Sequence, residues 1–110
     1  MSQFKVDITT EGTGAVVQAG QKIKAHYAGT LESNGKKFDS SYDRGQPLEF
    51  VVGAGQVIKG WDQGFVGLKV GTKAKLTCPP DYAYGNQDVG GGLIPANSTL
   101  IFEVEVVDIC

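Results

Sequence analysis

Few residues in this chain could carry out nucleophilic or metal chemistry. The chain holds one histidine, His26, and two cysteines, Cys78 and Cys110. A catalytic triad would have to use His26, but no serine stands in a G-x-S-x-G turn, so we interpret His26 as a solvated strand residue. One histidine and two distant cysteines make no zinc set, and VGGGLIP lacks the Lys-Ser/Thr of a phosphate loop. We therefore expect no metal, no cofactor and no covalent step.

Aromatic side chains are the other chemically distinctive group. They include Tyr27, Phe38, Phe50, Trp61, Tyr82, Tyr84 and Phe102. Each could belong to the core or to an apolar pocket. The two tyrosines of DYAYG are harder to explain by core packing, because they stand in a predicted loop.

Trp61 raises the same question most sharply. The stretch VIKGWDQGF (57–65) sets apolar side chains at helical spacing, yet it contains two glycines, which are poor helix formers. Either Trp61 fills the core, or it forms the floor of a binding site.

Alternating apolar and polar residues predict the strands that must position these side chains. The alternation favours a half-buried strand at 3–9, a hairpin at 22–39, and strands at 47–53, 71–79 and 98–109. One short amphipathic helix at 57–65 can cover the apolar face of such a sheet. We predict an α+β fold, with an antiparallel five- to six-stranded sheet wrapped around that helix. The long loops at 39–47 and 81–98 are candidate functional segments.

Composition and charge narrow the class of protein. The 110 residues carry 10 basic and 12 acidic side chains, a net charge of −2, which gives no electrostatic case for nucleic acid or an anionic membrane. No apolar run could span a bilayer, and the N-terminus does not read as a secretory signal. We expect one domain over 1–110 with reduced thiols in the cytoplasm, although the sequence leaves a bridge between the two cysteines open.

Five stretches of the chain form a recognisable set: HYAGTL (26–31), GKKFDSSYDRG (35–45), VIKGWDQG (57–64), LKVGTKAKLTCPPDYAYG (68–85) and IPANSTLIFEVEVV (94–107). Together they resemble FKBP-type peptidyl-prolyl cis-trans isomerases, the family that binds the macrolides tacrolimus and rapamycin. The resemblance covers essentially the whole chain. It implies the fold predicted above and rotation of X-Pro bonds in an apolar pocket.

The resemblance also implies roles for individual residues. The expected catalytic residues are Tyr27, Phe38, Asp39, Trp61, Tyr84 and Phe102. Further ligand contacts are expected from Arg44, Phe50, Gln56, Val57, Ile58 and Ile94. Trp61 would be the pocket floor, and Asp39, held by Arg44, would face the twisted carbonyl. The Ile58 N–H and the Tyr84 hydroxyl would donate hydrogen bonds to a ligand.

Two loops depart from the family pattern. The hairpin loop LESNGKK and the segment GNQDVGGGLIPAN each read about one residue longer, and Ala96 follows Pro95 where a second proline is common. We expect the pocket chemistry to survive and residues 88–93 to be mobile. In the family these loops shape the surface that a drug complex presents to calcineurin or the TOR kinase, so those drug-dependent partners are put in question.

Three functions remain open at this point. The first is an isomerase of proline-containing peptides that binds both macrolides and acts as a monomer. The second is a non-catalytic module that holds Leu-Pro segments of partner proteins in the same pocket. The third is a structural protein whose aromatic residues form only a core and bind no macrolide.

Overall fold

The computed structural model describes residues 4–90 and 93–110. Within these ranges six strands form one antiparallel sheet: β1 Lys5–Thr10, β2 Lys22–Leu31, β3 Lys37–Ser40, β4 Leu48–Val51, β5 Lys73–Cys78 and β6 Leu100–Ile109. The helical elements of the same ranges are α1 Ser41–Arg44, α2 Lys59–Gly64 and the 3-10 helix η1 Pro80–Tyr82. The predicted fold class is confirmed. Residues 39–47, predicted as a loop, contain the short helix α1 instead.

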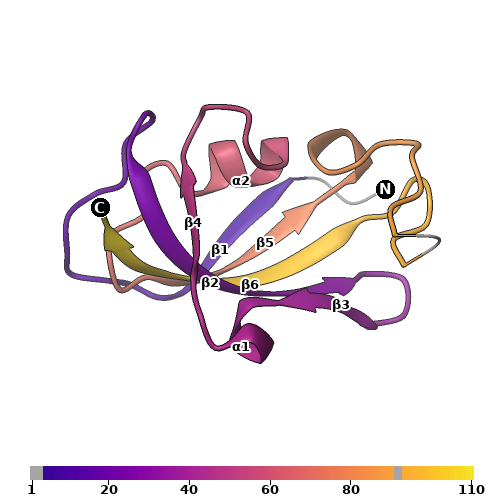
Figure 1. The fold of residues 1–110 in the computed structure, drawn as a ribbon, viewed down its shortest axis with the longest axis horizontal. Coiled ribbons are helices and arrows are strands. Elements are labelled where there is room, and N and C mark those ends of the chain that lie inside the picture. Colours follow the sequence, from indigo (N-terminus) through magenta and orange to yellow (C-terminus); the bar gives the residue numbers. More distant parts are fainter. Residues whose placement is uncertain (1–3, 91–92) are drawn as a thin grey trace.

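The sheet has the order β1-β5-β6-β2-β3, and β4 also pairs with β2. β4 pairs with the first half of β2 and β3 with its second half, so both short strands lie along the same edge. Figure 1 shows α2 lying against one side of the twisted sheet. Alternate side chains of a strand point to the side of the sheet that α2 covers. In β2, every second residue from Ile23 to Leu31 is buried in this way.

Two glycines explain how so short a helix can lie on the sheet. A Cβ atom on Gly60 would stand 2.5 Å from Cys78 Sγ, and one on Gly64 would stand 3.2 Å from Leu76 Cδ1. The helix therefore approaches β5 more closely than a larger residue would permit. The helix is shorter than the predicted 57–65, and Ile58 precedes it as an N-cap residue without a side-chain hydrogen bond. Its stability comes from packing rather than from helix propensity.

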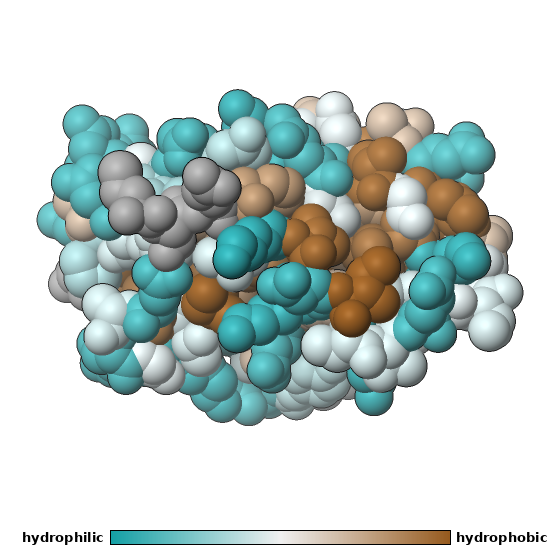
Figure 2. Space-filling model, turned by 180° about the vertical axis from the view of Figure 1, so that it is seen from behind, coloured by the Kyte–Doolittle hydropathy of each residue, from teal (hydrophilic) through white to brown (hydrophobic). Residues whose placement is uncertain are grey.

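The first strand differs from its prediction. β1 was expected to be half-buried, but all six of its residues are exposed. β1 is the end strand of the sheet. Val6 and Ile8 alternate with polar residues, as in a half-buried strand, but both are exposed because no other element covers them. Figure 2 shows apolar side chains gathered on the back of the molecule among polar ones.

The described part of the chain contains no helix long and apolar enough to cross a membrane. Cys78 is a buried free thiol and Cys110 an exposed one. Within residues 4–90 and 93–110, no three His, Cys, Asp or Glu side chains converge as metal ligands.

Candidate functional site

A cavity of about 170 Å³ opens between the sheet and the start of α2. It is lined by Tyr27, Phe38, Asp39, Leu48, Gln56, Val57, Ile58, Trp61, Tyr84 and Phe102. These residues come from β2, β3, β4, α2 and β6 and from two loops, so only the folded chain brings them together. The lining is mostly aromatic and aliphatic, and Asp39 is its one ionisable carboxyl group.

Trp61 belongs both to this cavity and to the core. It is only 4% exposed, and its ring meets Tyr27 and Phe102 edge-on at centroid distances of 4.8 and 5.2 Å. Phe50 and Phe65 pack behind it, 5.5 and 5.4 Å away. The buried indole Nε1 has no hydrogen-bond acceptor among the described residues. The two answers to the sequence question are therefore compatible, because Trp61 fills the core with part of its surface and lines the cavity with another.

Gly29 makes room for the aromatic wall. It lies on the inner face of β2, and a Cβ atom there would stand 2.6 Å from Phe38 Cζ and 2.9 Å from Phe102 Cε1. The rings of Phe38 and Phe102 meet nearly at right angles, with centroids 5.6 Å apart. A larger residue at position 29 would have to displace one or both rings.

A closed set of hydrogen bonds joins Asp39, Tyr27 and Arg44 at the mouth of the cavity. The Tyr27 hydroxyl donates to Asp39 Oδ2 at 2.5 Å and accepts from Arg44 Nη2 at 2.8 Å. Arg44 Nη1 donates to Asp39 Oδ1 at 2.7 Å. Both partners of this ion pair are almost half exposed, so its role is to orient groups more than to stabilise the fold.

The pKa values of Asp39 and Tyr27 are shifted in opposite directions in this network. Burial raises the pKa of Asp39, but the Tyr27 hydrogen bond, the Arg44 charge and the Ser40 N–H outweigh it and leave the pKa below 3.8. Burial, reinforced by the hydrogen bond to Asp39, raises the pKa of Tyr27 above 10.0. At neutral pH the cavity therefore holds an ionised carboxylate and a neutral phenol.

The short helix α1 positions Arg44. Ser40 caps the helix by accepting from Tyr42 N, and Gly45 ends it in the left-handed conformation at φ 71°. Fully buried Ser41 fixes the helix to β2, because its Oγ accepts from Tyr27 N at 2.7 Å. The predicted description of His26 as a solvated residue is therefore incomplete. Its Nδ1 lies 2.8 Å from Ser41 Oγ, and its ring stacks on Tyr42.

Three predicted site residues do not line the cavity. Arg44 acts on it only through Asp39 and Tyr27, and Phe50 lies behind Trp61. Ile94 is buried and exchanges backbone hydrogen bonds with Val89. Leu48 lines the cavity and was not predicted. Its spacing from Phe50, two residues along β4, was the available signal, because such residues share a face of a strand.

The rim of the cavity carries two hydrogen-bond donors. The Tyr84 side chain is 39% exposed, and burial followed by the charge of Asp39 raises the pKa of its hydroxyl. The Ile58 N–H has no acceptor among the described residues, whereas the Ile58 carbonyl accepts from both Trp61 N and Asp62 N. Both donors are thus available to a ligand.

The two loops that depart from the family pattern lie side by side. Glu32 N donates to Thr99 O at 3.0 Å, and the residues around them form a surface hollow of about 330 Å³ lined by Glu32, Ser33 and 95–99. The expected mobility of 88–93 falls partly on residues 91–92, which lie outside the described residues.

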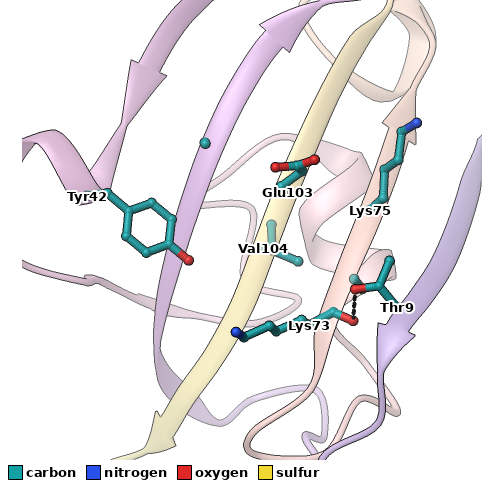
Figure 3. A pocket seen from close by; sticks show the side chains of 8 residues that line it. Thr9, Tyr42, Lys73, Lys75, Glu103 and Val104 are labelled. Atoms are coloured by element: carbon teal, nitrogen blue, oxygen red, sulfur yellow. Dashed lines mark hydrogen bonds between the residues drawn. The ribbon is translucent and has the colours of Figure 1, made fainter.

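A larger hollow of about 460 Å³ lies on the other face of the sheet. Figure 3 shows the Lys73 side chain extending over β6 on the side of Tyr42, whereas Lys75 points away from them. Thr9 Oγ1 donates to the Lys73 carbonyl at 3.1 Å. The labelled residues that line this outer hollow are mainly charged and polar, and Tyr42 is the one aromatic residue among them.

The fold and the cavity agree with comparisons to known proteins. Residues 14–107 match the FKBP-type peptidyl-prolyl cis-trans isomerase family, and the chain belongs to that family. It is 58% identical over 107 residues to FK506-binding protein 1A of Neurospora crassa, covering 96% of this chain and 88% of the relative. It is 54% identical to FK506-binding protein 2 of Podospora anserina, covering 96% of this chain and 57% of that longer protein. The crystal structure of AtFKBP13 matches with a TM-score of 0.90 and 44% identity, over 97% of this chain and 93% of that one.

Proposed function

We propose that this chain rotates X-Pro peptide bonds in the cavity above Trp61 and that tacrolimus and rapamycin bind in the same place. The observation that carries the proposal is the aromatic cavity itself, with a single ionised carboxylate at its mouth and free donors on its rim. Membership of the isomerase family and similarity to FK506-binding proteins support it.

The chemistry requires no nucleophile. Rotation about a peptide bond faces a barrier of roughly 18–20 kcal/mol, because resonance gives the C–N bond partial double-bond character. The twisted amide has lost that resonance and is less polarised than the planar one. An apolar cavity therefore accepts the twisted form more readily than the planar form, which is catalysis by differential binding. Proline has no N–H, so its ring enters without leaving a buried donor unpaired.

Individual residues have distinct roles in this mechanism. The proline ring rests on Trp61 between Phe38 and Phe102. The Ile58 N–H donates to a carbonyl of the bound chain and anchors it beside the rotating bond. Asp39, held ionised by Tyr27 and Arg44, faces the carbonyl that turns.

We propose further that the protein acts as a cytoplasmic monomer. A buried and an exposed free thiol suit a reducing compartment. Calcineurin or the TOR kinase would meet a drug complex at the surface of the loops that join around Glu32 and Thr99. Pull-down of each partner with and without drug tests that part.

The test of the activity is cis-to-trans exchange of a Leu-Pro peptide, with and without tacrolimus. We expect acceleration that the drug abolishes. Tight peptide or drug binding without acceleration would favour the binding-module function. Neither binding nor acceleration would mean that the aromatic residues serve only as a core.

A further inference from the structure

Within the segment between β4 and α2, residues 53–56 have little packing to hold their shape, whereas Val52 before them is buried in the core. Residues 53–56 are exposed, and Gly53 and Gly55 have φ values of +80° and +74°, a region that glycine adopts readily. A Cβ atom on Gly55 would meet nothing within 4 Å, and one on Gly53 would meet only Ala19, at 3.3 Å. A segment with so few contacts must be fixed by hydrogen bonds if it is to keep one conformation.

Asp62 supplies those bonds. Gly53 N donates to Asp62 Oδ1 at 2.9 Å, and Gly55 N donates to Asp62 Oδ2 at 3.0 Å. The Asp62 backbone N–H donates in turn to the Ile58 carbonyl at 3.1 Å. One residue therefore holds the segment at both ends, with two hydrogen bonds strengthened by the charge of the carboxylate.

The segment leads directly into the edge of the cavity. Gln56, Val57 and Ile58 follow Gly55 in the chain and line the cavity. The Gln56 side chain also closes the base of the segment, because its Oε1 accepts from Val51 N at 2.9 Å. Asp62 stands next to Trp61 on α2, so the floor of the cavity and the anchor of its edge share one helical turn.

We propose that Asp62 is a positioning residue that fixes the Val57–Ile58 edge and the Ile58 N–H before a ligand arrives. Without it, a bound peptide or macrolide would have to order this edge itself, at a cost in affinity. The catalytic part of this inference rests on the proposed function. A purely structural anchor would affect stability but would leave the affinity of the cavity unchanged.

The test compares Asp62→Asn with Asp7→Asn. Asparagine keeps the size of Asp62 but turns an NH₂ group toward one of the two glycine N–H groups. Asp7 lies exposed on β1, its side chain makes no hydrogen bond or ion pair with the described residues, and its substitution removes the same charge. Three quantities are measured on the full chain: amide hydrogen exchange, the tacrolimus Kd, and kcat and KM for a Leu-Pro peptide.

For Asp62→Asn we expect exchange at Gly53 and Gly55 to quicken by about tenfold, with the tacrolimus Kd and the peptide KM rising roughly five- to tenfold. We expect kcat to stay within about twofold and Asp7→Asn to behave as the wild type in every measurement. Faster exchange with unchanged Kd and KM would overturn the proposal, as would unchanged exchange.

A failure of the proposed function is seen separately, in the wild-type protein. If the wild type binds tacrolimus but does not accelerate exchange of the peptide, the isomerase function fails and the Kd comparison alone decides the role of Asp62. If the wild type binds neither tacrolimus nor the Leu-Pro peptide, the Val57–Ile58 edge binds no ligand, and both the proposed function and the role of Asp62 are overturned.

Discussion

The two faces of the sheet carry two hollows of very different character. The outer hollow, about 460 Å³ and bordered by Lys73, Lys75 and Glu103, is larger than the cavity above Trp61, which is about 170 Å³. The smaller one has an aromatic floor, aromatic walls and one oriented carboxylate. Size and side-chain arrangement therefore point to different hollows, and the function proposed here rests on the arrangement.

The largest difference between the faces should appear at two neighbouring residues of β2. Gly29→Ala places a methyl group 2.6 Å from Phe38 Cζ, so we expect unfolding free energy to fall by about 1–3 kcal/mol and kcat/KM to drop with it. Denaturant unfolding and peptide exchange measure the two effects.

The matched control is Ala28→Ser, because Ala28 borders the outer hollow. We expect it to change stability by no more than about 0.5 kcal/mol and to leave turnover unchanged. Equal effects at positions 28 and 29 would contradict the close packing described for Gly29.

Removal of one wall of the cavity should lower catalysis with the fold intact. Phe38 is half-buried and contacts Phe102, so we expect Phe38→Ala to reduce kcat/KM by about tenfold or more, about 1.4 kcal/mol in the barrier. Asp39→Val should also lower turnover. Lys73→Ala, in the outer hollow, should match the wild type. Normal activity in a folded Phe38→Ala variant would refute the assignment of the cavity.

The carboxylate at the mouth predicts a particular pH dependence. The pKa of Asp39 is lower in the folded protein than its usual 3.8, so its contribution to stability is complete above that value and is lost as pH falls through the folded pKa. We expect kcat/KM to be constant from neutral pH down to about 5. If kcat/KM changed with pH within this range, and if Asp39→Asn removed that change, Asp39 would not be ionised as inferred here.

The smallest effect concerns the two thiols, one buried beneath α2 and one at the surface. Burial raises the pKa of Cys78 to about 12, whereas Cys110 is exposed. We expect a thiol reagent at neutral pH to modify only Cys110 in the native protein and Cys78 after unfolding. Mass spectrometry of the modified protein identifies the site. Rapid modification of native Cys78 would show that α2 opens readily from β5.

The alternation of apolar and polar residues predicted burial correctly for strands that have a neighbouring strand on each side. The alternation in β2 and β6 matches their burial, because each has a strand on both sides and α2 covers one face. The same alternation misled at β1, where Val6 and Ile8 are exposed at the edge. Alternation shows which residues share a face but not whether another element covers it.

The site was predictable in its residue types but not in its arrangement. Resemblance to the family indicated most of the cavity lining, yet the sequence does not show that Phe50 lies behind Trp61 or that Leu48 reaches the cavity. The helix α1 did have a local signal, with a serine before it and Gly45 after it. The bonds from Asp62 to Gly53 and Gly55 depend on the path of the segment, which no residue pattern specifies.

We propose above all that proline-containing chains bind in the cavity above Trp61 and not on the outer face of the sheet. The most direct test is titration of the labelled protein with a Leu-Pro peptide, followed by NMR shifts of its backbone amides and of the Trp61 indole N–H. We predict that the changes concentrate at Phe38, Ile58 and Trp61. Changes centred instead on Ala28, Lys73 and Glu103 would contradict the account.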